Sequence, residues 1–395
     1  MSKSICPHDK CTGCTACLEA CPKQCIAMHP DSLDAYYPVV DESLCVDCGI
    51  CEKTCPNNRD VIYHVPQKVW AAWSKDDEVR RSSASGGIAY ELYRFWISQG
   101  GVATGVVYDR KEGAHFVLIQ SEKDIKATQN SKYTFSNIDG VYRKVKQKLN
   151  KGIGVLFIGV PCQIAGLYGY LKKDYENLLT VDLICHGLPP KAYLDQHVEN
   201  IEKKKNERTL ELFFRDPKYY TYTYTFTLKN KDGSEFYKRR VLGTDNYQLG
   251  YHRALIYREN CYHCQYARKK RVSDLTIGDF SGLGKCAPCE YEKRNTSCVL
   301  QNTEKGAKVL ENLGCVVTFD ERPQDEAFEF ERQLKAPSIK HKGRDIFEAV
   351  YKETKSYETA ANKALRNEKI KAVKLALDLK LRAWAKTILV LIHLK

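Results

Sequence analysis

The chain alternates between helical and strand-like hydrophobic patterns through residues 88–184. In chain order, the segments are the stripe Ile88, Leu92, Phe95 and Trp96, the run Val102–Tyr108, the stripe Val141, Val145 and Leu149, and the runs Val155–Ile158 and Leu178–Ile184. Apolar residues at three- and four-residue steps predict amphipathic helices, and short apolar runs predict buried strands. The alternation therefore predicts an α/β body with a mixed, partly parallel sheet.

Two further patterns lie nearer the C-terminus. Alternation of Tyr and Thr over Tyr220–Leu228 predicts a strand in a β-rich insertion, whose aromatic face either packs in the core or stacks on a flavin or substrate ring. From Ala360 to Lys395 we expect one long basic helix, with an apolar stripe at Ile370, Val373, Leu377, Leu381, Trp384, Ile388 and Leu391. Such a helix either lies on a membrane surface or docks on the body or on a partner.

The composition is that of a folded intracellular protein. The 395 residues, 43% of them hydrophobic, are enough for two or three domains with their own cores. No segment approaches the roughly 20 apolar residues of a membrane-spanning helix, and the first residues lack an apolar signal segment. We therefore expect a cytoplasmic protein, in which the last helix allows contact with the membrane at its cytoplasmic face. In a reducing cytosol, the 18 clustered cysteines indicate metal or redox chemistry.

The charge is distributed unevenly. Residues 1–60 contain five basic and nine acidic side chains, a net charge of −4, whereas the whole chain carries +13. This asymmetry indicates either an acidic module attached to a basic body that attracts anionic partners, or a well-solvated surface.

The first 60 residues contain an internal repeat of cysteines. Cys11, Cys14, Cys17, Cys21 and Pro22 recur, each 34 positions later, as Cys45, Cys48, Cys51, Cys55 and Pro56. The spacing C-x2-C-x2-C-x3-C-P is that of two-cluster ferredoxins, in which the fourth cysteine of each run ligates the other cluster. We therefore assign one [4Fe-4S] cluster to Cys11, Cys14, Cys17 and Cys55, and the second to Cys45, Cys48, Cys51 and Cys21.

Zinc is the alternative for these cysteines, but it takes four ligands in two paired motifs, which two four-membered runs fit badly. Residues 5–58 resemble bacterial two-cluster ferredoxins over essentially their whole length. Cys6 and Cys25 fall outside the repeat and are interpreted as small buried thiols. Cys298 and Cys315 lie in apolar, strand-like segments and are interpreted as core residues.

The body contains four further cysteines in distinctive positions. Cys162 and Cys185 each follow a predicted strand, so both are expected at the carboxyl edge of the sheet, where open α/β folds bind ligands. Cys261 and Cys264 form a CxxC pair. Together with the segments Ser83–Gly87, Ser131–Ser136, Phe214-Arg215 and Ser273–Asp279, these motifs resemble the coenzyme F420 hydrogenase/dehydrogenase beta-subunit family over roughly residues 68–310.

The resemblance implies an FAD-containing oxidoreductase with one [4Fe-4S] cluster beside the flavin. The implied ligands of that third cluster are Cys162, Cys185, Cys261 and Cys264, and four thiolates can hold such a cluster. A zinc site formed by the pairs Cys261/Cys264 and Cys286/Cys289 is the alternative, although their spacing is slightly longer than that of a zinc ribbon.

The flavin contacts implied by the resemblance lie in two segments. The turn Ser83–Gly87 precedes a predicted helix, and its backbone N–H groups suit a pyrophosphate or a flavin carbonyl, although such a turn is also an ordinary helix cap. Lys132 would place a positive charge near the flavin N1 and C2 carbonyl, unless it is a solvated surface lysine. The full set of candidate cofactor-binding residues is Ser83, Ser85, Gly86, Gly87, Lys132, Tyr133, Thr134 and Ser136.

No catalytic residue is fixed by the sequence, and Lys132 and His186 are the candidates. His186 follows a proposed cluster ligand and could relay a proton at neutral pH. Arg215 and Arg258 are candidate clamps for phosphate or carboxylate groups, or members of surface ion pairs.

These observations predict three parts: an α+β ferredoxin-like N-terminal module over residues 1–60, an α/β body with a mixed sheet and a β-rich insertion that binds flavin and the third cluster over residues 68–335, and a basic helical C-terminal tail over residues 336–395. The expected function is that of an iron–sulfur flavoprotein oxidoreductase. It would exchange electrons between a ferredoxin-type redox partner and a small organic substrate, such as coenzyme F420 or a polysaccharide-pathway intermediate.

Two other classes of function remain open at this point. One is a non-catalytic electron-transfer subunit of a larger redox complex. The other is a zinc-containing nucleic-acid-binding protein, for which salt-dependent affinity would be diagnostic. The chain has no helix-turn-helix or aromatic RNA-binding motif, so we expect no nucleic-acid partner.

Overall fold

The structure is a computed structural model that describes residues 3–241, 243–375 and 377. Its centre is an eight-stranded mixed sheet with the strand order β13-β3-β12-β11-β7-β6-β4-β5. The strands are β3 (Lys68–Ser74), β4 (Val102–Asp109), β5 (Gly113–Ile119), β6 (Val155–Gly159), β7 (Leu178–Leu183), β11 (Leu275–Asp279), β12 (Ser297–Gln301) and β13 (Val317–Arg322). The neighbouring strands β4, β6, β7 and β11 are parallel, and the outer strands pair antiparallel. The predicted mixed sheet is therefore confirmed.

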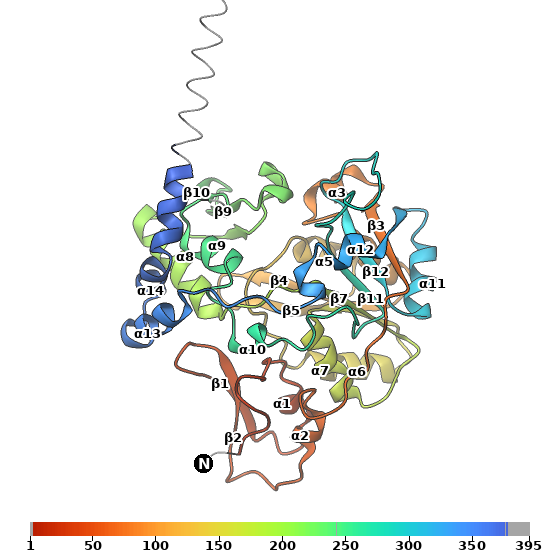
Figure 1. Ribbon diagram of the computed structural model, residues 1–395. Helices are drawn as coiled ribbons and strands as arrows, with labels where there is room; N and C mark the ends of the chain where they lie inside the picture. The colour runs from red at the N-terminus through yellow and green to blue at the C-terminus, as the bar shows by residue number, and fades with distance from the viewer. Residues whose placement is uncertain (1–2, 242, 376, 378–395) are drawn as a thin grey trace, which may run out of the picture.

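Helices cover both faces of this sheet (Figure 1). They are α3 (Asp77–Ser82), α4 (Ile88–Ser98), α5 (Glu122–Thr128), α6 (Val141–Asn150), α7 (Pro161–Leu171), α11 (Glu304–Asn312) and α12 (Gln324–Phe328). Strand β6 shows how the alternation works: Leu156 and Ile158 pack with the side chains of α4 and α11, and Val155 and Phe157 pack with those of α6 and α7. The helices and strands predicted over residues 88–184 are thus confirmed.

A second lobe holds the predicted β-rich insertion. It contains α8 (Lys191–Lys205), a three-stranded antiparallel sheet of β8 (Glu211–Phe213), β9 (Phe226–Lys229) and β10 (Glu235–Arg239), and the helices α9 (Asn246–His252), α10 (Glu259–Tyr262), α13 (Arg344–Thr354) and α14 (Tyr357–Ala364). Their aromatic side chains form one buried core, in which Tyr193, Tyr247, Phe347 and Tyr357 are in contact.

The strand predicted over Tyr220–Leu228 is wrong in its first half. Residues 217–219 and 221–223 form two 3-10 turns, η1 and η2, and the strand begins only at Phe226. Tyr224 adopts a left-handed backbone conformation and leaves the sheet. Its ring stacks on the Arg215 guanidinium at 4.2 Å, and its hydroxyl donates to Asp279 Oδ2 at 2.6 Å. Tertiary contacts therefore override the local alternation.

The C-terminal helix differs from the expected single helix over residues 360–395. Helix α14 begins earlier, at Tyr357, and ends at Ala364, and a second helical stretch covers residues 366–375. Within the described part of the stripe, Ile370, Val373 and Leu377 are exposed; Leu381, Trp384, Ile388 and Leu391 lie outside the described residues. Among the described residues, none of the helices has the length and apolar character needed to cross a bilayer.

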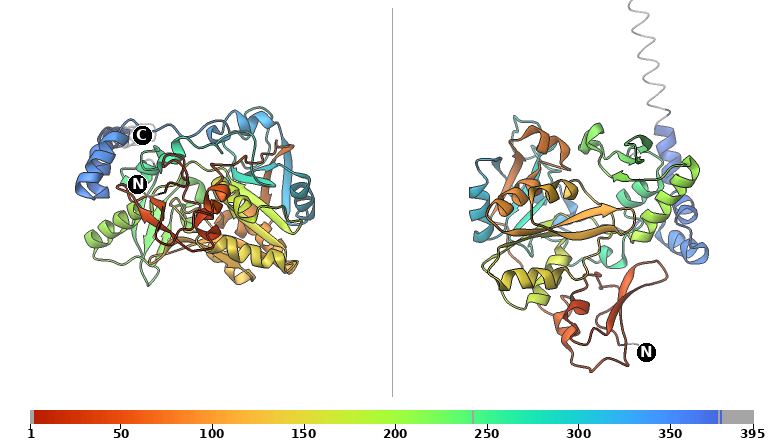
Figure 2. Two further views of the ribbon diagram at one scale, coloured as in Figure 1. Left: turned by 90° about the horizontal axis from the view of Figure 1, so that it is seen from below. Right: turned by 180° about the vertical axis from the view of Figure 1, so that it is seen from behind.

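The N-terminal module lies against one side of the body, below α6, α7 and α10 in Figure 1, and the rear view in Figure 2 shows the same arrangement. It consists of two short helices, α1 (Ala16–Ala20) and α2 (Ile50–Thr54), and an antiparallel pair, β1 (Ile26–Pro30) and β2 (Tyr36–Val40). Each helix follows the first two cysteines of a run and carries the third, Cys17 on α1 and Cys51 on α2.

Candidate redox site

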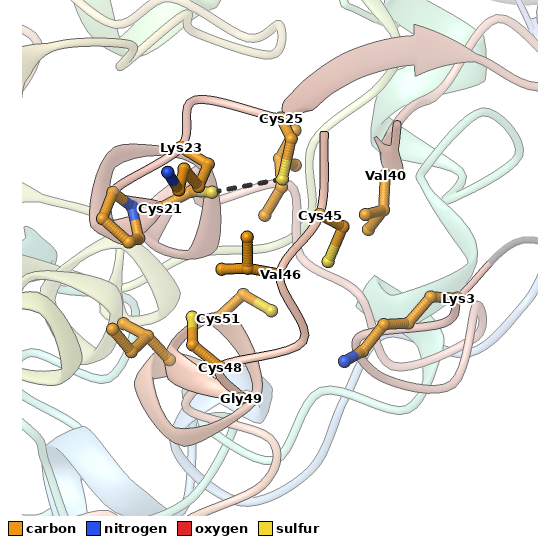
Figure 3. Close-up of a pocket in the computed structure, with 13 residues that line it drawn as sticks. Lys3, Cys21, Lys23, Cys25, Val40, Cys45, Val46, Cys48, Gly49 and Cys51 are labelled. Atoms are coloured by element: carbon orange, nitrogen blue, oxygen red, sulfur yellow. Dashed lines mark hydrogen bonds between the residues drawn. The ribbon is translucent and has the colours of Figure 1, made fainter. Parts of the chain in front are cut away.

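The two cysteine sets assigned from the repeat each line their own cavity in the N-terminal module. Cys11, Cys14, Cys17 and Cys55 line the first, which we call the inner site. Cys45, Cys48, Cys51 and Cys21 line the second, the outer site, and Figure 3 shows their side chains around it. In both sites the fourth cysteine comes from the other run of the repeat. This is the ligand exchange that the C-x3-C-P spacing predicts.

Each site also contains a fifth thiol that sequence reasoning did not place there. Cys25 lines the outer site, where its Sγ lies 3.4 Å from Cys21 Sγ (Figure 3). Cys6 lines the inner site, and the side-chain amide of Asn57 lies 3.9 Å from its Sγ and from Cys55 Sγ. The repeat gives no signal for either thiol, because the position 34 residues after Cys6 holds Val40 and the position 34 residues after Cys25 holds Arg59.

The four body cysteines assigned to a third cluster come together between the sheet and α10. Cys162 is at the start of α7, directly after β6; Cys185 follows β7; and Cys261 lies on α10, with Cys264 after it. Burial raises the pKa of the Cys162 thiol well above its usual range, and the thiols of the other three, close by, raise it further. Leu188 N–H points at Cys261 Sγ at 3.5 Å. We call these four residues the body cysteines.

The structure also bears on the zinc alternative for the body cysteines. A zinc ion holds four thiolates at about 2.3 Å, so the sulfurs must gather tightly. Among the described residues, the body cysteines do not form a group whose ligand atoms all lie within 4.8 Å of one another; such a group is formed by Asp109, Glu112 and His115, of which Glu112 is exposed. In the zinc alternative Cys286 and Cys289 would join Cys261, but Cys286 is exposed and Cys289 Sγ points at Tyr291 O at 3.5 Å.

A large cavity of about 500 Å³ lies at the carboxyl edge of the parallel strands. Its wall includes Cys185 and His186 after β7, Ile158 and Gly159 at the end of β6, and Asp279 at the end of β11. This is the edge at which open α/β sheets bind ligands. One of the four body cysteines, Cys185, therefore lines the cavity.

Most of the predicted cofactor-binding residues line this cavity: Ser83, Ser85, Gly87, Lys132, Tyr133, Thr134 and Ser136. Gly86 faces the sheet instead, because its N–H donates to Ser297 Oγ at 2.8 Å and its carbonyl accepts from Ser74 N at 2.7 Å. Gly87 has a φ of 89° and precedes α4, and a Cβ there would press on Val79 at 3.1 Å. The turn therefore needs glycine for conformational reasons as well.

Lys132 is held by its own loop. Its Nζ donates to the carbonyls of Thr128, Gln129 and Asn130 at 2.8, 2.7 and 3.2 Å. Burial lowers the pKa of the Lys132 ammonium to about 7, and an anion in the cavity would raise this pKa again. Because its three hydrogen bonds go to these carbonyls, Lys132 would offer a bound anion a positive charge but no free hydrogen-bond donor. The Thr134 hydroxyl, in contrast, is buried and lacks a hydrogen-bond partner among the described residues.

The cavity wall also carries a second cluster of polar side chains, formed by Arg215, Tyr224, His252 and Asp279. Of these, only Arg215 was a candidate from the sequence. Arg215 Nη1 pairs with Asp279 Oδ2 at 2.7 Å, and Tyr224 bridges both residues. Burial, aided by the positive charge of Arg215, lowers the pKa of His252 to about 4, so its imidazole is neutral at pH 7. Asp279 is the last residue of the Ser273–Asp279 segment, but no local pattern in the sequence indicated a role for Tyr224 or His252.

The N-terminal module is joined to the body mainly through α7. A Cβ added at Gly166 would lie 3.0 Å from Cys14 Sγ, so this turn of the helix contacts an inner-site cysteine directly. Cys162 lies one helical turn earlier, and residues four apart share a helix face. Tyr142 and Tyr266 pack in the same cluster as Cys14, Cys162 and Cys264. Helix α7 thus connects the inner site with the body cysteines.

Arg258 fits neither of the two roles considered for it, a clamp for a phosphate or carboxylate in the cavity or a member of a surface ion pair. The residue is outside the cavity wall, and its Nη2 donates to the carbonyls of Cys11 and Tyr36 in the N-terminal module at 3.2 and 3.0 Å. The expectation of a core position for Cys315 is also wrong, since this thiol is exposed at the end of a turn, whereas Cys298 is buried in β12 as predicted.

Known proteins place these features in a class. Residues 10–58 match the 4Fe-4S dicluster domain, so the N-terminal module is an iron–sulfur module. Its curated relatives include a seven-iron ferredoxin from Hydrogenibacillus schlegelii, 41% identical over 61 residues, which are 15% of this chain and 68% of the ferredoxin. The predicted [4Fe-4S] chemistry of this module is therefore confirmed.

The body matches the two halves of one family. Residues 69–142 match the coenzyme F420 hydrogenase/dehydrogenase beta subunit N-terminal part, and residues 153–322 match its C-terminal part. The chain belongs to the coenzyme F420 hydrogenase/dehydrogenase beta-subunit family, with a dicluster module in front, and the resemblance found in the motifs is confirmed.

Two further similarities are weaker. The coenzyme F420-dependent sulfite reductase of Methanocaldococcus jannaschii is 24% identical over 186 residues, which are 46% of this chain and 28% of that enzyme, so the chain spans little more than a quarter of its length. A chain of the F420-reducing [NiFe] hydrogenase complex from Methanosarcina barkeri superimposes with a TM-score of 0.42 and 17% identity, covering 77% of this chain and 91% of that one.

Proposed function

We propose that this protein is a flavin-dependent iron–sulfur oxidoreductase. In the proposed reaction a small organic substrate exchanges two electrons with FAD in the central cavity, and a redox partner protein exchanges single electrons with the N-terminal module. Three [4Fe-4S] clusters would connect the two, held by the outer site, the inner site and the body cysteines. Coenzyme F420 is one candidate substrate, because related proteins named above use it.

One observation carries the proposal: the body cysteines share a wall with the cavity on one side and a helix with the inner site on the other. Cys185 lines the cavity, and Cys162 begins the helix that contacts Cys14 one turn later. A flavin that exchanges two electrons with a substrate can pass single electrons to a series of clusters only if one cluster lies next to it. The arrangement of these residues provides that meeting point.

The cavity residues fit a flavin nucleotide in chemical type. The Ser83–Gly87 turn precedes α4, whose first N–H groups favour a phosphate. The Thr134 hydroxyl, which has no hydrogen-bond partner within the described part of the chain, is a buried donor that a bound ligand would satisfy. When bound, FAD supplies the conversion between two-electron exchange with a substrate and one-electron exchange with clusters.

The side chains on the cavity wall would bind the flavin and orient the substrate beside it. Lys132, fixed by three carbonyls, stabilises negative charge in the cavity without donating a proton. Arg215 and Asp279 form a polar pair on the wall, suited to orienting a polar substrate. His252, neutral at pH 7, and His186 are the side chains there that can hold or release a proton at a ring nitrogen.

The outer site is the proposed contact for the redox partner. Cys48 is exposed there, and the side chains of Leu44 and Val46 beside Cys45 are 56% and 57% exposed. Asp41 and Glu42 lie on the same exposed segment. This combination of apolar and acidic residues favours a partner with a basic surface around its own redox centre.

Cofactor quantification tests the proposal directly. Protein reconstituted anaerobically is expected to contain about twelve iron atoms, from three clusters of four, and one FAD per chain released by acid. About eight irons with one zinc would overturn the third cluster. A colourless acid extract without flavin fluorescence would overturn the enzymatic function and leave a non-catalytic electron-transfer subunit.

A pair of substitutions tests the ligand assignment. Cys162→Ser is expected to remove about four irons and one cluster signal, while the two signals of the N-terminal module persist. Cys298→Ser is the matched control, because this thiol is equally buried but lies in β12, away from the body cysteines. Unchanged iron content in Cys162→Ser would contradict the assignment.

A further inference from the structure

Arg258 is a buried guanidinium whose polar contacts are all neutral. Its side chain is 2% exposed. It donates to the carbonyls of Cys11 and Tyr36 and, through Nε, to Asn260 Oδ1 at 3.3 Å. The rings of Tyr37 and Phe135 lie 4.8 and 5.3 Å from its Cζ. Among the described residues, it has no carboxylate partner within ion-pair distance.

The other deeply buried arginines of the described chain do have such partners. The pairs are Arg215–Asp279 at 2.7 Å, Arg271–Asp182 at 2.8 Å, Arg322–Glu326 at 2.8 Å and Arg344–Glu348 at 2.6 Å. A buried charge without a counter-charge is strongly unfavourable, and guanidinium groups remain protonated in proteins. Arg258 therefore requires negative charge from another source.

The position of Arg258 indicates what that source is. Its Nη2 reaches the carbonyl of Cys11, an inner-site ligand, and Gly13 leaves room for the guanidinium, since a Cβ there would lie 3.2 Å from Nη2. On the other side, Arg258 precedes α10, and Cys261 N donates to its carbonyl at 3.0 Å. Arg258 therefore lies between the backbone of Cys11 in the inner site and the start of the helix that carries Cys261.

We propose that Arg258 supplies the shared counter-charge of two iron–sulfur clusters, one in the inner site and one on the body cysteines, and that it favours the reduced state of both. A cluster held by four thiolates is anionic and gains one more negative charge on reduction. A nearby fixed cation therefore stabilises the reduced state more than the oxidised state. The second cluster rests on the function proposed above, whereas the first belongs to the dicluster module.

The test is a redox titration of the full-length, anaerobically reconstituted chain, followed by electron paramagnetic resonance. Arg258→Gln keeps an amide donor and removes the charge. At a fixed solution potential we expect the reduced-to-oxidised ratio of the inner-site and body clusters to fall about tenfold, equivalent to about 59 mV for a one-electron couple. The outer-site cluster serves as the internal control and keeps its potential. Three unchanged potentials, or an equal shift in all three, would overturn the proposal.

Two more variants separate charge from docking. Arg258→Lys keeps the charge but loses the planar fork that reaches both carbonyls, so potentials near those of the wild type are expected. If Arg258 acted only as a docking contact, this variant would behave like Arg258→Gln. Asn260→Asp adds a carboxylate against Arg258 Nε with little change in shape, and we expect a smaller fall in the same two ratios.

Iron content distinguishes failure of this inference from failure of the proposed function. A wild-type content of about eight irons would remove the body cluster, and the inner-site shift alone would then decide the role of Arg258. A content of about twelve irons with no shift in Arg258→Gln or Asn260→Asp would refute this inference alone.

Discussion

The inner and outer sites arise from one sequence repeat, yet the fold gives them different surroundings. The inner site lies against the body, where Cys14 contacts α7 at Gly166 and the backbone of Cys11 accepts a hydrogen bond from Arg258. The outer site lies at the surface, with Cys48 exposed and Leu44 and Val46 beside it. The repeat therefore gives both sites the same set of cysteines, and the contacts outside the repeat determine whether a site faces the body or the solvent.

Under the proposed function, this difference assigns a position to each site: the inner site faces the body and the outer site faces a partner protein. It does not show in which direction electrons flow. A buried site with a fixed neighbour suits internal transfer, since its distance to the next centre stays constant. An exposed site with apolar and acidic side chains suits encounters with a partner. The following predictions test this contrast, beginning with the largest expected effect.

Substitution of Gly166 by Val is expected to have the largest effect. The new side chain would meet Cys14 Sγ and the Tyr142 hydroxyl, at 3.0 and 2.8 Å from its Cβ alone. Overpacking of this kind costs about 1–3 kcal/mol of unfolding free energy. In dithionite-reduced protein, we also expect weaker magnetic coupling between the inner-site cluster and the body cluster, measured by electron paramagnetic resonance.

Gly154→Ala is the control for this substitution. A Cβ at Gly154 would be 3.5 Å from its nearest neighbours, an ordinary contact, so stability and coupling are expected to remain those of the wild type. Equal loss of stability in both variants, with unchanged coupling, would show that α7 does not set the spacing between the two clusters.

Oxidative loss of iron is the second expected contrast. During stepwise anaerobic addition of ferricyanide, followed by a chelator, the outer-site signal is expected to disappear before the inner-site signal. The physical reason is access, because Cys48 is exposed whereas Cys11, Cys17 and Cys55 are buried. A Cys48→Ser variant identifies the outer-site signal. Simultaneous loss of both signals would contradict the contrast in burial.

The sequence predicted this contrast only in part. Cysteine spacing predicted which four cysteines line each site, because a repeat of thiols is a local pattern, and strand periodicity placed Cys162 and Cys185 at one sheet edge. The role of Gly166 was invisible, since a glycine in a helix gives no sign of the cysteine that packs on it. Arg258 was misassigned for the same reason: its partners are carbonyls more than 200 residues away in the chain.

The cavity shows the same limit. The Ser83–Gly87 and Ser131–Ser136 segments were identified as motifs and do line the cavity, apart from Gly86 and Phe135. Tyr224 was predicted in a strand, because the Tyr–Thr alternation around it is a strong local signal. Its contacts with Arg215 and Asp279 instead draw it out of the sheet. Long-range polar contacts of this kind leave no periodic trace in the sequence.

Charge reversal at the outer site is expected to have a smaller effect than the changes above. Glu42→Lys should slow electron transfer to cytochrome c, a basic one-electron acceptor, by a few-fold, since one surface charge pair is worth about 0.2–1 kcal/mol. The difference should fade at about 1 M salt, where the Debye length is near 3 Å. Glu311→Lys, on α11 of the body, is the control of equal charge change. If both variants were slowed equally, the outer site would not be the contact surface.

The smallest expected effect concerns the fifth thiol of the outer site. Cys25 Sγ lies 3.4 Å from Cys21 Sγ, so either could in principle be the fourth ligand there. The C-x3-C-P spacing assigns Cys21, because its counterpart in the repeat, Cys55, lines the inner site in the same way. Cys25→Ala is therefore expected to leave the iron content unchanged, whereas Cys21→Ala should lower it or alter the outer-site signal. If Cys25→Ala lowered the iron content and Cys21→Ala did not, Cys25 would be the fourth ligand of the outer site. The two sites would then share a cysteine repeat but differ in which of its positions bind iron.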